Sequence, residues 1–392
     1  MRSIVFISLP SLALAAAAHA VPPAYSITDL GTLTPGATYF EPGSVGFAIN
    51  DAGTIAGYAV TNLPNRNFHG FRFANGLMAD LGVYNGDEHS IAYAINDAGS
   101  VVGISYKLGE TFVHGVLWPA GGSAVSLGTV EPHDINTSGS IAASTPIAGS
   151  LGVSHAALVV GSSVTDLGTL GGASSTGLAI NDAGWVVGES LLADNKTPRG
   201  FVWRNGSLLS LPTLGGTTGR AQDISGLHVV GMSDTPSGGA PHATLWTLDQ
   251  LGNLASTTDL GTLPGRASSA ALAVGANGVV LGTSGDLAFM STPNGLVDLN
   301  GLIPSGAGWQ LVKATGINAD GSIVGVGRHY GQQRAFLLTP APAADFNGDG
   351  HVDAADLSML LGAWNQKGTQ FDLSGDGVVG PEDLAYLLSA WG

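Results

Sequence analysis

The fold is decided by residues 91–128, which read IAYAINDAGSVVGISYKLGETFVHGVLWPAGGSAVSLG. Four short runs of β-forming residues can be marked in this stretch, at 91–95, 101–105, 114–118 and 124–127. The first two runs flank Asn96-Asp97-Ala98-Gly99, a turn whose glycine can take the positive φ that closes a hairpin. The stretch therefore predicts four antiparallel strands joined by tight turns.

The same unit recurs along the chain. Its end is marked by a short motif that occurs seven times, as Asp29-Leu30-Gly31, Asp80-Leu81-Gly82, Ser126-Leu127-Gly128, Asp166-Leu167-Gly168, Ser210-Leu211-Pro212, Asp259-Leu260-Gly261 and Asp298-Leu299-Asn300. Successive copies start 39 to 51 residues apart. A period of about 45 residues is that of one four-stranded propeller blade.

The two ends of the repeat region complement each other. The region begins with a strand of the fourth type at 25–30, and the last repeat has only its first three strands, at 314–317, 322–326 and 334–338. The N-terminal strand can complete the last blade, which closes the ring and removes open sheet edges. We therefore predict a mainly β fold, a seven-bladed β-propeller over residues 21–338.

Other arrangements of the repeats stay open. An open solenoid would need polar capping repeats, and the repeats show none. Six or eight blades would result if the third repeat, whose turn at 136–139 reads NTSG, were irregular.

Composition narrows the class of protein. The 392 residues include 60 Gly and 19 Pro, which disfavours a helix-rich fold. Hydrophobic residues make up 44% and charged residues 11%, so the chain can bury a large core. The net charge of −16 and the absence of a basic cluster exclude nucleic acid as a partner and suit a chain that binds divalent cations.

The N-terminus predicts export. Arg2 is followed by an apolar run at 4–18 and by Ala18-His19-Ala20, a small-x-small cleavage site, so residues 1–20 are expected to be a signal peptide. No later segment reaches the roughly 20 apolar residues of a membrane span. A secreted location, extracellular or at the cell surface, is expected. The chain has no Cys and so cannot use disulfides.

The repeat motifs resemble a known family. Sequences such as DLGTLGG at 166–172 and AINDAGSVVGIS at 94–105, with a His-initiated third strand, are similar to the HAF repeats of exported bacterial proteins. The resemblance implies a β-rich extracellular repeat protein and brings no catalytic residue. The repeat histidines are His69, His114, His155 and His242, with Arg199, Leu287 and Arg334 in their place elsewhere. Because equivalent positions lie on separate blades, we expect them to have a structural role.

The C-terminus has a different character. After a Pro/Ala linker at 339–344, residues 345–356 read DFNGDGHVDAAD and residues 372–383 read DLSGDGVVGPED. Both fit a twelve-residue calcium loop, in which oxygen ligands stand at positions 1, 3, 5, 7 and 12 and Gly at position 6 permits the turn. The predicted metal residues are Asp345, Asn347, Asp349, His351 (carbonyl), Asp353 (through water) and Asp356 in the first loop, and Asp372, Ser374, Asp376, Val378 (carbonyl) and Asp383 in the second.

Each loop leads into an apolar pattern typical of a helix. The patterns are Leu357, Leu360, Leu361, Trp364 and, 27 residues later, Leu384, Leu387, Leu388, Trp391. The position-8 valines, Val352 and Val379, are expected to pair the two loops as short strands. The predicted module is residues 345–392, two loop-helix units related by a pseudo-twofold axis with two bound Ca2+ ions.

Two calcium loops that are each followed by a helix and end in Asp resemble a type I dockerin. That resemblance implies calcium-dependent docking onto a cohesin domain of another protein. Dockerins often carry a Ser-Thr type pair at loop positions 10 and 11, where this chain has Ala354-Ala355 and Pro381-Glu382. Calcium binding is therefore better founded than the choice of cohesin.

The function expected from these parts is attachment. We predict an exported, non-catalytic binding or adhesion protein whose tail docks onto a cohesin-type partner or cell-surface scaffold, and whose propeller meets a polysaccharide or another extracellular ligand. The alternative is a polysaccharide-degrading enzyme, a glycoside hydrolase or lyase, with a propeller catalytic domain. Hydrolysis needs two carboxylates about 5 to 10 Å apart, and nothing in the sequence pairs the acids outside the repeat pattern, Asp87, Glu88, Glu131, Glu189 and Asp234. No Gly-x-Ser-x-Gly, phosphate-loop or His-Glu-x-x-His motif is present.

Overall fold

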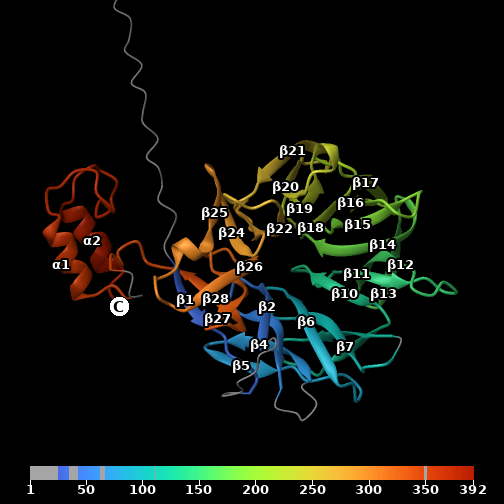
Figure 1. Cartoon of the computed structure of the whole chain (residues 1–392). Helices are drawn as coiled ribbons and strands as arrows, with labels where there is room; N and C mark the ends of the chain where they lie inside the picture. Colours follow the sequence, from blue (N-terminus) through green and yellow to red (C-terminus); the bar gives the residue numbers. More distant parts are fainter. Residues whose placement is uncertain (1–24, 35–42, 62–66, 111, 348–350) are drawn as a thin grey trace, which may run out of the picture.

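The computed structural model describes residues 25–34, 43–61, 67–110, 112–347 and 351–392. The predicted signal peptide at residues 1–20 lies outside the described residues. Seven four-stranded antiparallel sheets are arranged as blades around a central axis, and two short helices follow (Figure 1). The predicted seven-bladed β-propeller is confirmed. No helix in the described part is long and apolar enough to cross a membrane.

The strands of each blade follow one another from the centre outward. Blades 1 to 3 are β2 (Ser44–Ile49), β3 (Ile55–Val60), β4 (Phe68–Ala74), β5 (Leu77–Asp80); β6 (His89–Ile95), β7 (Val101–Tyr106), β8 (His114–Trp118), β9 (Val125–Gly128); and β10 (Glu131–Ile135), β11 (Ile141–Pro146), β12 (Ser154–Val160), β13 (Ser163–Gly168). Blades 4 and 5 are β14 (Gly171–Ile180), β15 (Val186–Leu192), β16 (Pro198–Arg204), β17 (Ser207–Ser210); and β18 (Gly219–Ser225), β19 (His228–Asp234), β20 (Pro241–Leu248), β21 (Leu254–Gly261). Blades 6 and 7 are β22 (Ser269–Val274), β23 (Val280–Ser284), β24 (Leu287–Thr292), β25 (Gly295–Asp298); and β26 (Trp309–Ile317), β27 (Ile323–His329), β28 (Gln332–Pro340), β1 (Tyr25–Asp29). Short 3-10 helices span Pro236–Gly238 and Leu299–Leu302.

The ring is closed by the strand from the N-terminus. β1 pairs antiparallel with β28, in a register that runs from Tyr25 opposite Pro340 to Asp29 opposite Phe336. Tyr25 is buried in one cluster with Phe336 and Leu338 of β28. The predicted closure is confirmed, and the third repeat is a complete sheet, so the alternatives of six or eight blades are wrong. β28 also extends to Pro340, two residues into the predicted linker.

Apolar clusters fill the space between neighbouring blades. One of them combines Ile55 and Phe71 of blade 1 with Val324 and Ala335 of blade 7. Each sheet is thus buried on both faces, which explains why the second strands read as continuous apolar runs rather than as alternating ones.

Every innermost strand carries a β-bulge. The register between the first two strands shifts at one equivalent position in every blade, with a second shift in blades 4 and 7. The bulge residues at the equivalent position are Phe47, Tyr93, His133, Leu178, Gln222, Leu272 and Thr315. In most blades a glycine of the second strand packs closely against the backbone of the innermost strand next to the bulge. A Cβ on Gly103, for example, would stand 1.9 Å from the Ile91 carbonyl oxygen, so no larger residue fits there. The bulge turns one side chain per blade out of the sheet alternation.

Asparagines of the inner turns join successive blades. The Asn50 side-chain nitrogen donates to the carbonyl of Asn96 at 3.0 Å, and its oxygen accepts from Thr54 N at 2.8 Å. Asn318, Asn96, Asn136 and Asn181 make the equivalent donation to the next blade. Gly99 in such a turn has φ of +77°, as predicted. The turns are hairpins, and they also hold the ring together.

Half-buried carboxylates make a similar link from two blades, blade 5, where the asparagine is missing, and blade 3, where Asn136 is present as well. Blade 5 has Ser225 at the asparagine position, and Asp223 accepts from Val274 N of blade 6 and from Ile224 N, both at 2.8 Å. Burial raises the pKa of Asp223 to about 7, and the neighbouring charge of Asp134 adds to the rise. Asp134 makes the same link from blade 3 to Ile180 N at 2.8 Å.

The repeat histidines pair within their blades. His69 Nδ1 lies 2.9 Å from Asp80 of the closing motif, and His155 and His242 pair equally with Asp166 and Asp259. Blade 2 has Ser126 at the Asp position, and His114 pairs instead with Asp87 at 2.9 Å. These hydrogen-bonded pairs are consistent with the structural role predicted for the histidines.

The C-terminal helices α1 (Ala354–Gly362) and α2 (Pro381–Ser389) share one small core with Val352 and Val379. The valines do not pair with each other, contrary to expectation. Val379 O accepts from Asn365 N at 2.9 Å and Val352 O from Gly392 N at 3.2 Å, so each position-8 residue pairs with the segment after the other helix. The offset of 27 residues between these bonds supports the predicted pseudo-twofold symmetry. Leu361 and Leu388 are 50% and 53% exposed, so the apolar pattern of each helix is not wholly buried.

Removal of residues 21–33 will open the ring. Loss of β1 exposes the edge of β28 and removes the burial of Tyr25 and Leu30, about 2 to 3 kcal/mol for each side chain. We expect the melting temperature of the propeller to fall by at least about 5 °C, measured by calorimetry. Removal of residues 341–392 is the control and should leave the propeller transition unchanged. A 21–33 deletion that melts like the wild type would contradict the closure.

Asp223 makes propeller stability depend on pH. Its native pKa of about 7 lies above its unfolded value of about 3.9, so between these values the native state holds a proton that the unfolded state has lost. The advantage of the wild type over Asp223→Asn should therefore shrink as pH rises from 5 to 7, by up to about 1.4 kcal/mol per pH unit, and level off above. Urea unfolding of both proteins measures this. His133, whose pKa burial lowers to about 4, makes stability change with pH in the opposite direction. Because both proteins contain His133, its contribution cancels in the difference between them. A constant difference would refute the assignment.

Candidate functional site

The second acidic loop gathers its carboxylates around one point. One oxygen from each of Asp372, Asp376 and Asp383 lies within 4.8 Å of the others. Ser374 Oγ donates to Asp372 Oδ1 at 3.3 Å, which places this hydroxyl beside one of the three carboxylates, and Val378 N donates to Asp376 Oδ1 at 2.8 Å. An all-oxygen set with three carboxylates suits a hard divalent cation such as Ca2+.

The last acid of this loop is fixed by the backbone. Asp383 is buried in the first turn of α2, and its two oxygens accept from Ser374 N at 2.8 Å and from Gly380 N at 2.6 Å. Burial raises the pKa of this carboxyl, but the hydrogen bonds outweigh burial and hold it below its usual value. Asp383 is thus ionised and positioned toward the loop before any ion arrives.

The first loop repeats this arrangement. Asp356 is buried and accepts from Phe346 N at 2.8 Å, Asn347 N at 3.2 Å and Asp353 N at 2.9 Å. Asp353 accepts from Ala355 N at 2.8 Å and so caps α1. Asp345 and His351 lie in this loop too, and Asp349 lies outside the described residues. The donor types in both loops fit Ca2+, whose charge would offset the repulsion among the carboxylates.

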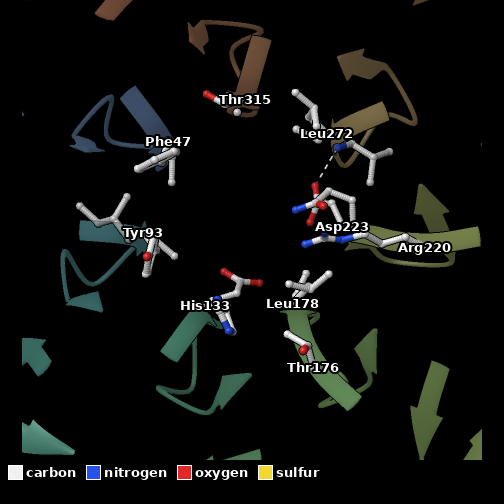
Figure 2. Close-up of a pocket in the computed structure, with 18 of the residues that line it drawn as sticks. Phe47, Tyr93, His133, Thr176, Leu178, Arg220, Asp223, Leu272 and Thr315 are labelled. Atoms are coloured by element: carbon white, nitrogen blue, oxygen red, sulfur yellow. Dashed lines mark hydrogen bonds between the residues drawn. The ribbon is translucent and has the colours of Figure 1, made fainter. Parts of the chain in front are cut away.

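A second candidate site lies on the propeller axis. A cavity of about 720 Å³, here called the bulge chamber, is lined by the innermost strands of all seven blades and includes Phe47, Tyr93, His133, Leu178, Leu272 and Thr315 (Figure 2). A second cavity of about 670 Å³ lies among the Asn turns and shares Ile49, Ile95, Asp134 and Val274 with the first. The bulge residues thus meet at the centre of the ring.

Aromatic rings line one side of the bulge chamber. The Phe47 and Tyr93 ring centroids are 5.7 Å apart, and those of Tyr93 and His133 are 5.9 Å apart. All three side chains are half-buried. Burial lowers the pKa of His133 to about 4, and the charge of Arg220 acts in the same direction, so the imidazole is neutral at pH 7.

Charged groups line much of the bulge chamber. Arg220 Nε lies 4.0 Å from Glu189 Oε2, and Lys313 and Glu131 also face the cavity. Burial raises the pKa of Glu131. Figure 2 shows Arg220 and Asp223 across the cavity from Phe47 and Tyr93. The chamber therefore combines an aromatic side with both positive and negative groups.

Sequence reasoning missed this chamber, although the repeats carry its signal. The motif before each turn reads GFAIN at 46–50, AYAIN at 92–96, PHDIN at 132–136 and GLAIN at 177–181. Its second position, which is the bulge residue, varies in size and polarity, while the position before it is Gly, Ala or Pro and the position after it is Ala except for Asp134 in blade 3. A position that varies among otherwise similar repeats indicates a side chain freed from packing.

The acidic residues outside the repeat pattern lie in different surroundings. Glu131 and Glu189 both line the bulge chamber. Asp87 pairs with His114, Glu88 lies 3.9 Å from Lys107, and Asp234 accepts from Thr218 Oγ1 at 2.6 Å. The structure thus brings two of the five acids to one cavity.

Solved structures are similar to the propeller in fold. The β-propeller domain of the Trilobed protease from Pyrococcus furiosus aligns with a TM-score of 0.54 and 9% identity, covering 77% of this chain and 94% of that one. A structure from a study of two prolyl endopeptidases aligns with a TM-score of 0.52 and 13% identity, covering 81% of this chain but only 47% of the other. At these identities the likeness shows the propeller fold alone.

The comparison with curated proteins found no match. The C-terminal loops and helices, in contrast, match a known family. Residues 343–389 match the family model of the Dockerin type I domain, and this match also supports calcium binding.

Proposed function

We propose that this chain is an exported, non-catalytic binding protein. Its C-terminal module would attach it to a cohesin-type partner or a cell-surface scaffold. The observation that carries the proposal is the repeated loop-helix module, in which Asp372, Asp376 and Asp383 converge and which matches the dockerin family. The propeller, built from HAF-type repeats, would present the ligand site. Each of the two loops would hold one Ca2+ ion.

Exposed apolar side chains support docking onto a protein. Leu361, Tyr386, Leu388 and Trp391 are between 46% and 56% exposed on the C-terminal module. Leu361 and Leu388 occupy equivalent positions of the two units. Side chains of this kind gain stability when a partner covers them, which suits a surface that binds a cohesin.

Calcium binding by the second loop depends on Asp376. This residue is exposed, and its carboxylate accepts a local bond from Val378 N. Asp376→Asn should therefore leave the apo fold intact and weaken one of two Ca2+ sites by at least about 10-fold, measured by calorimetric titration. Asp320→Asn, in an exposed propeller turn, is the matched control. A wild type that binds fewer than two ions, or a variant with unchanged titration, would contradict the assignment.

Docking is tested by capture of the full chain on immobilised type I cohesins. We expect binding in Ca2+ and loss of binding in chelator, because the helices pack on loops that the ions close. Leu361→Asp combined with Leu388→Asp should weaken capture by at least about 10-fold, whereas Leu151→Asp, at a propeller residue that is 91% exposed, should not. Capture that ignores chelator, or no capture by any cohesin, would count against the proposal.

A further inference from the structure

The bulge chamber differs from the rest of the propeller in having no repeat symmetry. The inter-blade links and apolar clusters recur around the ring, whereas the seven bulge positions hold an aromatic, apolar or polar residue depending on the blade. A residue needed only for packing would be repeated with its surroundings. The asymmetry therefore indicates a function for the chamber that is separate from holding the blades together.

Its aromatic side is a stacking surface. Phe47, Tyr93 and His133 come from three consecutive blades and form an arc with ring centroids 5.7 and 5.9 Å apart. Tyr58 supports the arc from behind, 5.8 Å from Phe47. Because the three rings are half-buried but line a cavity, their apolar surface is available to a ligand that enters it.

The opposite side offers hydrogen-bond donors and acceptors together. Arg220 and Lys313 can donate from blades 5 and 7, Glu189 of blade 4 can accept and Gln222 of blade 5 can do both, while Glu131 adds an acceptor in blade 3, in the same strand as His133. Arg220 and Glu189 lie 4.0 Å apart at Nε and Oε2, so a donor and an acceptor stand next to each other at the cavity wall.

The charges select the class of ligand. A purely cationic ligand would meet Arg220 and Lys313, and a purely anionic one would meet four carboxyl groups, those of Glu131, Asp134, Glu189 and Asp223. A neutral ligand rich in hydroxyl groups avoids both penalties, because each hydroxyl can donate and accept. The apolar C–H face of a sugar ring matches an aromatic surface. The volume of about 720 Å³ lies within the range of about 300 to 1,000 Å³ typical of small-ligand sites.

We propose that the bulge chamber binds neutral sugar residues, with Phe47 and Tyr93 as the stacking surface and Glu189 and Arg220 as the groups that bind hydroxyls. This inference rests on the proposed function, in which the propeller presents the ligand site. The sugar can be a free oligosaccharide or the end of a longer glycan, since both present the same rings.

The test uses the full chain saturated with Ca2+ and a panel of oligosaccharides of two to four residues. The panel contains neutral gluco-, manno- and xylo-oligosaccharides, uronate-bearing ones and amino-sugar ones, and titration calorimetry measures binding. We expect at least one neutral member to bind. Competition by the corresponding polymer then shows whether glycan ends are bound as well as free sugars.

Variants place the sugar in the chamber. Tyr93→Ala and the conservative Glu189→Gln should each weaken binding by at least about 10-fold, while Tyr330→Ala, at a residue that is 78% exposed on the propeller surface, should not. Glu189→Gln keeps the size of the side chain, so its result stands even if Tyr93→Ala fails to fold. Binding by no neutral member, binding only by charged members, or equal binding by the Glu189 and Tyr330 variants would overturn the proposal.

Cohesin capture of the same samples separates this proposal from the proposed function. Absence of sugar binding by the wild-type chain, with intact Ca2+-dependent capture, overturns the chamber assignment alone. Analysis of the sugars after incubation adds a second readout: chamber-dependent binding with cleavage would support the site and overturn the non-catalytic part of the proposed function.

Discussion

The backbone ladder between β1 and β28 is the constraint on which the propeller depends. It joins residues about 300 positions apart in the chain and completes the seventh sheet. Without it, blade 7 would end at an open edge, and blades 1 and 7 would be joined mainly by bonds of side chains such as Asn318 and by the backbone bond from Gly43 N to Gln333 O at 3.2 Å. Ion pairs reinforce the ladder, since Asp29 of β1 accepts from His329 at 2.8 Å and lies 3.9 Å from Arg334. A closed ring also fixes how far the innermost strands stand from the axis, and so the width of the chamber between them.

Within the closed ring, structural and functional demands fall on different positions. Asn links, Asp223 and the second-strand glycines maintain the spacing of the blades. The bulge turns one side chain per blade toward the central cavity instead of into the space between the sheets. The contacts that these side chains make differ from blade to blade: Phe47, Tyr93 and His133 touch as rings, and Thr315 Oγ1 donates to Gly46 O at 2.8 Å. Seven such positions can vary independently, which allows an asymmetric site in a symmetric scaffold.

The sequence allowed the blades, their number and the closure to be predicted because these depend on short-range patterns. The turn Asn96-Asp97-Ala98-Gly99 and the closing Asp-Leu-Gly motif recur in register, and the calcium loops have fixed spacing. The chamber was not predicted, because a bulge shifts the alternation by one residue and a strand pattern read with period two places Phe47 or Tyr93 on the wrong face. The partners of Val352 and Val379 were also missed, since backbone pairing across a pseudo-twofold axis leaves no sequence pattern.

The two sites have separate physical supports. The core around Leu360 and Leu387 contains only residues between Ala344 and Leu387, whereas the blade cores draw on Tyr25 to Leu338, and no cluster of described residues combines the two sets. A cation that stabilises one core cannot change the other through shared packing. Ca2+ would therefore control whether the chain is attached without changing the affinity of the chamber. The propeller can then bind its ligand whether or not the tail is attached, because the two events stabilise different cores.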